Sequence, residues 1–154
     1  MFSVIVYGLS IVLLFLASTC YHAIKNSNKK HYYRIADHIG IYLLIAGTYT
    51  PVLLLVIPNG LGWTQFWVVC GIAAIGFILK LFFTGRFDNL STFLYLAMGW
   101  LALIPYSELA AALDSAAMAW LIAGGVAYTV GVVFYAAERI PYNHFIWHLF
   151  VLGG

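Results

Sequence analysis

The sequence predicts an all-α protein, a polytopic bundle of transmembrane helices, and three observations support this fold class. The chain has 154 residues, of which 64% are hydrophobic and only 8% are charged, and its mean hydropathy is +0.98. A soluble domain carries about 25% charged residues, so this chain has too few charges to cover a surface exposed to water. Apolar stretches of about 20 residues, the length that spans a bilayer core, recur along the chain. The basic residues gather in alternate connections between these stretches.

Five full spans and a shorter sixth segment are expected, in chain order at about residues 2–24, 35–57, 63–83, 90–106, 116–137 and 141–154. The sixth has only about 14 residues, too few to cross a membrane as a helix. Short connections separate the segments: a polar loop at 25–31, an uncharged turn at 58–60, a loop at 84–89, and a loop holding Glu108 and Asp114.

Some features within the segments predict local structure. Gly47 and Pro51 indicate a kink in the second segment, because neighbouring helices can satisfy the backbone groups that proline frees. Lys80, near the end of the third segment, is expected to extend its ammonium group to the membrane surface. In the fifth segment, small residues recur every four positions and indicate a packing face inside the bundle, with a contact between copies as the less favoured alternative: Ala119, Ala123, Ala127 and Gly131.

Charge placement predicts the orientation of the chain in the membrane. All seven basic residues lie at the first, third and fifth connections or the adjoining helix ends: Lys25, Lys29, Lys30, Arg34, Lys80, Arg86 and Arg139. The second and fourth connections contain no Lys or Arg. Cytoplasmic loops carry an excess of Lys and Arg, so the first, third and fifth connections are expected to be cytoplasmic.

Two histidines near the end of the chain are candidate metal ligands. His144 and His148 are four residues apart in an apolar segment that begins near Pro141. On a helix this spacing places both imidazoles on one face, about 6 Å apart along the axis, so both can reach one metal ion. The alternative is a pair of interfacial histidines that form hydrogen bonds with their neighbours.

The predicted topology brings further polar residues to the same membrane depth. His22 and Ser18 lie near the cytoplasmic end of the first segment, and Asp37 lies near the cytoplasmic start of the second. Three neutral imidazoles with a fourth position open for water form the ligand set of a catalytic zinc centre. Asp37 could hold and deprotonate that water, and Ser18 could donate a hydrogen bond to a bound substrate.

Two other histidines are left out of the predicted site. His31 falls in the solvated loop that joins the first two segments. His38 follows Asp37 directly in sequence, and on a helix its side chain points about 100° away from that of Asp37.

Three motifs together resemble the bacterial hemolysin III family, which belongs with the progestin and adipoQ receptors and is more distantly similar to alkaline ceramidases. The motifs are Ser18-Thr19-Cys20-Tyr21-His22, Ala36-Asp37-His38-Ile39-Gly40-Ile41 with Gly47-Thr48-Tyr49-Thr50-Pro51, and His144-Phe145-Ile146-Trp147-His148. The resemblance implies a seven-helix bundle with an intramembrane zinc near the cytoplasmic side, in the plasma (inner) membrane of a bacterium. It also implies that His22, His144 and His148 ligate the zinc, with Asp37 and Ser18 around the bound water.

The chain departs from the family pattern at both ends. Residues 1–154 are expected to form a single transmembrane domain that lacks the family's first helix and the end of its last. The segment at residues 2–24 therefore resembles the family's second helix.

Three functions follow as expectations. The first is a zinc-dependent hydrolase that acts on an amide or ester of a membrane lipid, as in the related ceramidases. The second is a pore or cytolysin, although the ionisable residues gather at one side and do not line the whole membrane depth as a pore requires. The third is a receptor-like protein with a structural zinc. The expected partners are the bilayer and a lipid substrate; no nucleic acid is expected, and protein partners stay open.

Overall fold

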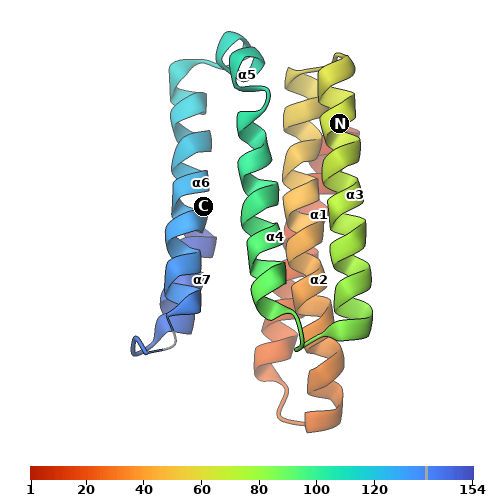
Figure 1. Ribbon diagram of the computed structural model, residues 1–154, viewed down its shortest axis with the longest axis vertical. Helices are drawn as coiled ribbons and strands as arrows, with labels where there is room; N and C mark the ends of the chain where they lie inside the picture. The colour runs from red at the N-terminus through yellow and green to blue at the C-terminus, as the bar shows by residue number, and fades with distance from the viewer. Residues whose placement is uncertain (138) are drawn as a thin grey trace. The chain divides into compact units, whose positions relative to one another are not determined.

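A computed structural model describes residues 1–137 and 139–154, apart from the side chains of Ser27 and Asn28. All regular elements in this part of the chain are helical, which confirms the predicted fold class (Figure 1). Four of the helices are long and apolar enough to cross a membrane, or five if the segments Asp88–Leu103 and Tyr106–Ala112 together form one broken span. The chain divides into two compact units, Met1–Leu101 and Ala102–Gly154.

The helices of each unit follow the chain order. The first unit contains α1 (Phe2–Ala23), α2 (Ser27–Pro51), a π-helical turn (Val52–Val56), α3 (Gly60–Phe83) and α4 (Asp88–Trp100), and it ends at the start of a 3₁₀ turn (Leu101–Leu103). The second contains α5 (Tyr106–Ala112), α6 (Ser115–Ala136) and α7 (Asn143–Gly153).

Helix α2 is the centre of the first unit, where it contacts α1, α3 and α4 (Figure 1). Two glycines let α1 approach it closely. A Cβ atom on Gly40 would lie 2.9 Å from Cδ1 of Leu14, and one on Gly47 would lie 2.9 Å from Cβ of Ser10. Close backbone approach through small residues stabilises helix pairs in membranes, where water expulsion does not drive association.

The α1–α2 connection is much shorter than predicted. Residues 27–31, expected in a loop, belong to the first turns of α2, and only residues 24–26 connect the two helices. Asn26 explains the early start, because its Oδ1 atom accepts a hydrogen bond from the backbone N–H of Lys29 at 3.3 Å. An Asn in this position satisfies one of the N–H groups that have no partner at a helix start.

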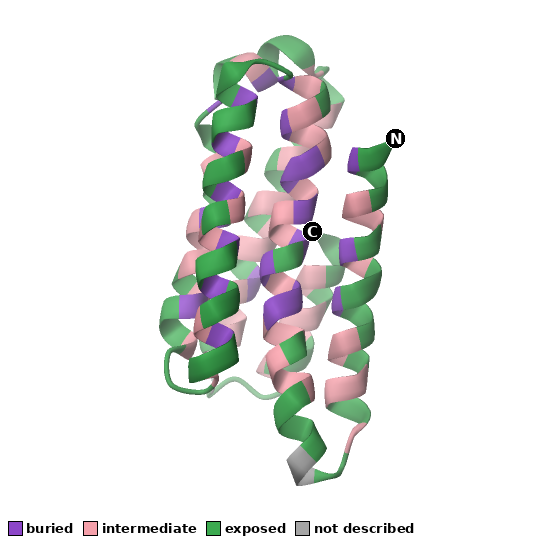
Figure 2. Cartoon of the chain, turned by 90° about the vertical axis from the view of Figure 1, so that its right-hand side faces the viewer, coloured by how far each residue is buried: buried purple, intermediate pink, exposed green. Residues whose placement is uncertain are grey.

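Helix α3 presents one continuous face to the interior of the first unit. Asn59 caps its start by accepting hydrogen bonds from the N–H groups of Leu61 and Gly62. The buried residues recur at intervals of three and four, which is the period of one helix face: Gly62, Gln65, Val69, Ala73, Gly76 and Lys80. Figure 2 shows buried positions on the inner sides of the helices, with exposed residues facing outward.

Pro51 changes the helix type and does not end the helix. Proline has no N–H to donate to the carbonyl of Gly47, so the regular α-helical bond is missing there. The chain continues through the π-helical turn at Val52–Val56, in which the bonds reach one residue further. The disturbance expected around Gly47 and Pro51 is therefore a π turn that follows the proline.

The fourth predicted segment ends earlier than expected. Helix α4 stops at Trp100 and does not continue to Tyr106. Pro105 accounts for this, because it cannot donate a hydrogen bond to the carbonyl of Leu101. The side-chain amide Nε2 of Gln65 donates to that carbonyl in its place. The Tyr49 hydroxyl likewise donates to the carbonyls of Met98 and Gly99, at 2.7 and 2.9 Å.

The connection predicted to hold Glu108 and Asp114 is mostly helical. Glu108 lies in the short helix α5, and Asp114 caps α6 by accepting a 2.7 Å hydrogen bond from the N–H of Ala117. The third connection is also shorter than predicted, because α4 begins at Asp88.

Helices α6 and α7 pack against each other in the second unit. The rings of Phe134 and Phe150 stack with centroids 5.5 Å apart, and a Cβ on Gly131 would lie 2.8 Å from Cβ of Phe150. The predicted packing face is therefore correct at Gly131, which is buried. Ala123 and Ala119, about two and three turns earlier, are exposed.

Candidate metal centre

The two histidines of α7 are brought together as predicted. Nε2 of His144 and Nε2 of His148 are 3.2 Å apart, and the ring planes are nearly perpendicular, at 86°. Two imidazole nitrogens that bind one tetrahedral zinc at about 2.0–2.1 Å are about 3.3–3.4 Å from each other. The two atoms are therefore spaced as two ligands of one zinc ion. A hydrogen bond between the imidazoles has a similar length, so the distance by itself fits both interpretations.

Aromatic contacts with α6 hold this helix face in place. The ring of Tyr135 lies 6.4 Å from that of His144 and 5.6 Å from that of Trp147, measured between centroids. The helix begins two residues later than expected, at Asn143, because Tyr142 adopts a left-handed conformation with φ of 60°. Pro141 therefore lies in the turn before α7 and not in its first turn.

Ser18 and Asp37 lie on neighbouring helices of the first unit. The contacts of Gly40 with Leu14, and of Gly47 with Ser10, show that α1 and α2 are antiparallel. Continuing this register toward the end of α1 places Ser18 level with Asp37. Both residues are half-buried.

His22 lies one turn after Ser18, on the same side of α1. Its imidazole is exposed and contacts the ring of Tyr21 edge-on, with centroids 4.9 Å apart. Three histidines are thus available as ligands: His22 in the first unit, and the His144–His148 pair in the second. Imidazole nitrogen suits zinc better than the hard cations magnesium and calcium, so the donor set fits a zinc ion.

A cluster of charged residues in the first unit was missed by the sequence analysis. The carboxylate of Asp88 accepts hydrogen bonds from Nζ of Lys80 at 2.7 Å and from Nη2 of Arg34 at 2.9 Å. The Lys80 ammonium group lies at the α3–α4 end of the first unit but does not reach solvent, because its side chain is only 2% exposed. The pairing with Asp88 lets the ammonium group stay inside, where an unpaired charge would be costly.

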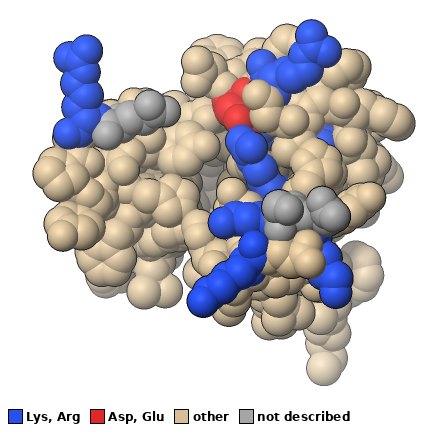
Figure 3. Space-filling model, turned by 90° about the horizontal axis from the view of Figure 1, so that it is seen from below, with Lys and Arg blue, Asp and Glu red and all other residues tan. Residues whose placement is uncertain are grey.

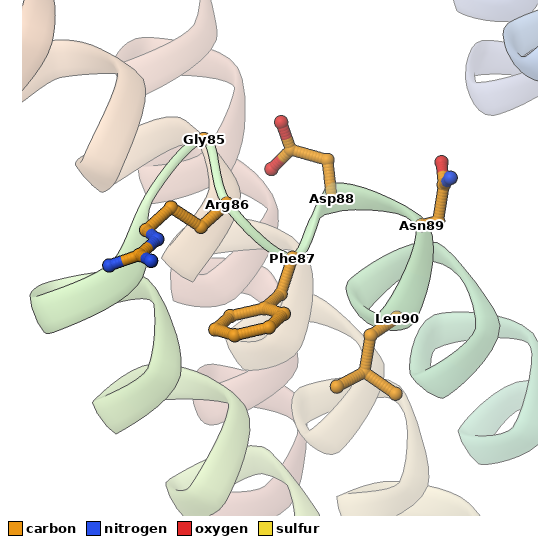
Figure 4. A pocket seen from close by; sticks show the side chains of 6 residues that line it. All are labelled: Gly85, Arg86, Phe87, Asp88, Asn89 and Leu90. Atoms are coloured by element: carbon orange, nitrogen blue, oxygen red, sulfur yellow. The ribbon is translucent and has the colours of Figure 1, made fainter.

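The same region contains two further features. The Tyr95 hydroxyl donates to the carbonyl of His38 at 3.1 Å, and Nδ1 of His38 is buried. Residues 85–90 line a hollow in which Arg86 and Asp88 point in different directions (Figure 4). The hollow contains none of the predicted site residues.

These observations define a class of protein. The chain is a multi-pass helical membrane protein with a pair of facing imidazoles at the start of its last helix.

Comparison with known proteins identifies the family. The model of the family described as "Haemolysin-III related" matches residues 1–154, the whole chain. The chain is 46% identical over 149 residues to Hemolysin-3 of Bacillus cereus, which covers 97% of this chain and 68% of that protein. It is 47% identical over 149 residues to the Hemolysin-3 homolog of Bacillus subtilis (strain 168), covering 97% and 70%. The chain belongs to the haemolysin III family, as its three motifs predicted.

A more distant similarity extends to mammals. The human Monocyte to macrophage differentiation factor is 32% identical over 152 residues, which cover 95% of this chain and 63% of that protein. No solved structure matches the chain.

Proposed function

We propose that this protein is a zinc-dependent hydrolase that cleaves an amide or ester bond of a membrane lipid. In this proposal His22, His144 and His148 bind the zinc, near the cytoplasmic face of the plasma membrane. The observation that carries it is the 3.2 Å separation of the His144 and His148 Nε2 atoms, which suits two ligands of one tetrahedral ion. Three imidazoles leave one coordination position for water, as catalytic zinc sites do.

The position of Asp37 beside the charged cluster of the first unit supports a lipid substrate. Asp37 lies one helical turn inward from Arg34, whose pairing with Asp88 marks the level of the charged cluster. In the proposed topology this level is close to the boundary between the headgroups and the hydrocarbon, where the ester and amide bonds of lipids lie. A lipid carbonyl can therefore reach Asp37 and Ser18 without leaving the bilayer.

The chemistry assigns a separate task to each residue. A bound zinc ion would supply a water with its pKa lowered to about 7, and a Lewis acid for the carbonyl oxygen. Asp37 accepts a proton from the water as the water oxygen adds to the carbonyl carbon. Ser18 donates a hydrogen bond to the carbonyl oxygen as negative charge develops on it. The proton then passes to the leaving amine or alcohol as the C–N or C–O bond breaks, which releases a fatty acid.

A cytolytic function is the second candidate, because the relatives from Bacillus bear the name hemolysin. A pore needs polar groups that face a common lumen. Several buried hydroxyl groups of the first unit instead bond to carbonyls of their own helices: Ser10 to Tyr7, Thr50 to Ala46 and Ser91 to Phe87. The hydrolase therefore remains the better-supported proposal.

The test measures zinc and turnover in the same purified samples. Zinc is quantified by mass spectrometry, and turnover is the release of fatty acid from ceramide and from a lysolipid, with a chelated sample as control. His148→Ala should lose both zinc and turnover. Asp37→Ala should keep most of the zinc while turnover falls by about 10²–10⁴-fold, the usual cost of losing one acid–base group.

His31→Ala is the matched control, because it removes an exposed histidine that the proposal does not use. It should keep both zinc and turnover. Unchanged zinc in His148→Ala would refute the metal site. Zinc binding with no turnover above the chelated sample, for either lipid, would instead favour a structural zinc in a receptor-like protein.

A further inference from the structure

The end of the α1–α2 hairpin extends beyond the rest of the first unit. The ion pair between Arg34 and Asp88 places the α3–α4 connection level with Arg34. Residues 27–33 of α2 continue past that level, a distance of about 10 Å at 1.5 Å per residue. Figure 2 shows this extension, with exposed residues around its end. We refer to residues 24–33 as the hairpin tip.

The hairpin tip has a strong positive charge. It contains Lys25, Lys29 and Lys30, all exposed, and its sequence has no Asp or Glu. Asp88 does not offset this charge, because its carboxylate pairs with Lys80 and Arg34. Figure 3 shows basic side chains gathered at this end of the molecule, with an acidic group among them.

The helix itself adds to this positive potential. Lys29 and Lys30 lie in the first turns of α2, where the backbone dipole is positive and where acidic residues are normally favoured. The first turn of α2 has no acidic residue. An anion from outside the chain that lies against this end of α2 is therefore favoured by both the lysines and the helix dipole.

Aromatic residues at and beside the hairpin tip suit the layer of the lipid headgroups. Tyr32 is 72% exposed, and Nζ of Lys30 lies 5.5 Å from the centroid of the Tyr21 ring. Tyr is enriched at the membrane–water interface, and a cation within about 6 Å of such a ring is attracted to it. The headgroup layer is about 5–7 Å thick on each side of the hydrocarbon core, so a 10 Å extension passes through it.

We propose that the hairpin tip binds the phosphate groups of anionic phospholipids in the surrounding leaflet, through Lys25, Lys29 and Lys30. Basic residues next to a transmembrane helix attract anionic lipids, and each contributes about a fivefold change in affinity near the surface. The proposal does not depend on the metal site. It assigns a lipid-binding role to residues that the proposed hydrolase leaves unused.

The test titrates the full chain, purified in a neutral detergent, with short-chain phosphatidylglycerol and measures binding by calorimetry. Short-chain phosphatidylcholine is the neutral comparison. The wild type should bind phosphatidylglycerol at least tenfold more tightly, and the preference should decrease as salt rises. A tenfold excess of inorganic phosphate should not displace the lipid, because free phosphate lacks the acyl chains held beside the hairpin.

Three variants locate the site. Replacing Lys25, Lys29 and Lys30 together with Gln should reduce the affinity for phosphatidylglycerol by about 10–100-fold. Replacing the same three with Arg keeps the charge and should preserve the affinity within about threefold. Arg86→Gln removes an exposed cation from the α3–α4 connection and is the matched control for position, with an expected change of less than threefold.

The helical content of each variant is checked by circular dichroism before titration. An equal loss in Arg86→Gln and in the triple Gln variant would show diffuse charge attraction and overturn the proposed site. Equal affinity for the two lipids in the wild type, or displacement by inorganic phosphate, would overturn it as well.

Discussion

Gly71 and Gly76 lie little more than one turn apart in α3, yet their surroundings differ completely. Gly71 is exposed, and a Cβ atom there would have no neighbour within 4 Å. A Cβ on Gly76 would overlap the ring of Tyr42, which is fully buried and therefore cannot move aside. Gly76 therefore permits the contact between α2 and α3, whereas Gly71 takes no part in that contact.

This difference predicts opposite effects of one substitution at the two positions. Gly76→Ala should destabilise the protein by about 1–3 kcal/mol, the usual cost of overpacking a core. Gly71→Ala should stabilise it by about 0.5–1 kcal/mol, because alanine loses less backbone entropy in a helix. Thermal unfolding of the two variants in the same detergent, followed by circular dichroism, measures both effects. Equal stability of the two variants would contradict the packing of α3 on Tyr42.

At the scale of elements, the break at the end of α4 depends on groups from two other helices. Pro105 leaves the carbonyl of Leu101 without its usual donor, and Gln65 of α3 supplies one. Tyr49 of α2 donates to the two neighbouring carbonyls at Met98 and Gly99. Non-helical backbone inside a membrane persists where the protein itself satisfies its polar groups.

Gln65→Leu should therefore destabilise the protein by about 1–3 kcal/mol, the cost of leaving a buried carbonyl without a partner. Thr64→Val is the matched control from the adjacent position. Thr64 is exposed and its hydroxyl bonds only to the carbonyl of Gly60 in the same helix, so a change below about 0.5 kcal/mol is expected. Denaturant titration of both variants in detergent compares them. A Gln65→Leu variant as stable as Thr64→Val would show that the break needs no side-chain donor.

At the scale of the whole molecule, the distribution of basic residues predicts one orientation in the membrane. In a variant without Cys20 and Cys70, His31→Cys should react with a membrane-impermeant maleimide only after the cells are opened. Pro58→Cys should react from outside in intact cells. Pro58 is preferred to Asn59 for this purpose because the Asn59 side chain caps α3. The reverse labelling pattern would place the proposed metal site in the opposite leaflet.

The sequence alone determined the properties that depend on neighbouring residues in the chain. Composition and apolar stretches determined the class of protein, and helical spacing determined that His144 and His148 share a face. The motifs determined the family. The four long helices begin or end within a few residues of the predicted positions, except at the start of α2. There Asn26 caps the helix, which extends into a segment that composition marked as a loop.

The tertiary structure decided what depends on residues distant in the chain. Asp88 pairs with Lys80, eight residues away, and with Arg34, which is 54 residues away, and no local pattern marks these partners. The register of α1 on α2, which places Ser18 level with Asp37, likewise follows from two glycine contacts. A hydropathy scale predicts that a lysine lies at the membrane surface, because the scale takes account only of the hydration of its charge by water. Inside the folded chain a carboxylate takes the place of water, and this is why Lys80 is buried.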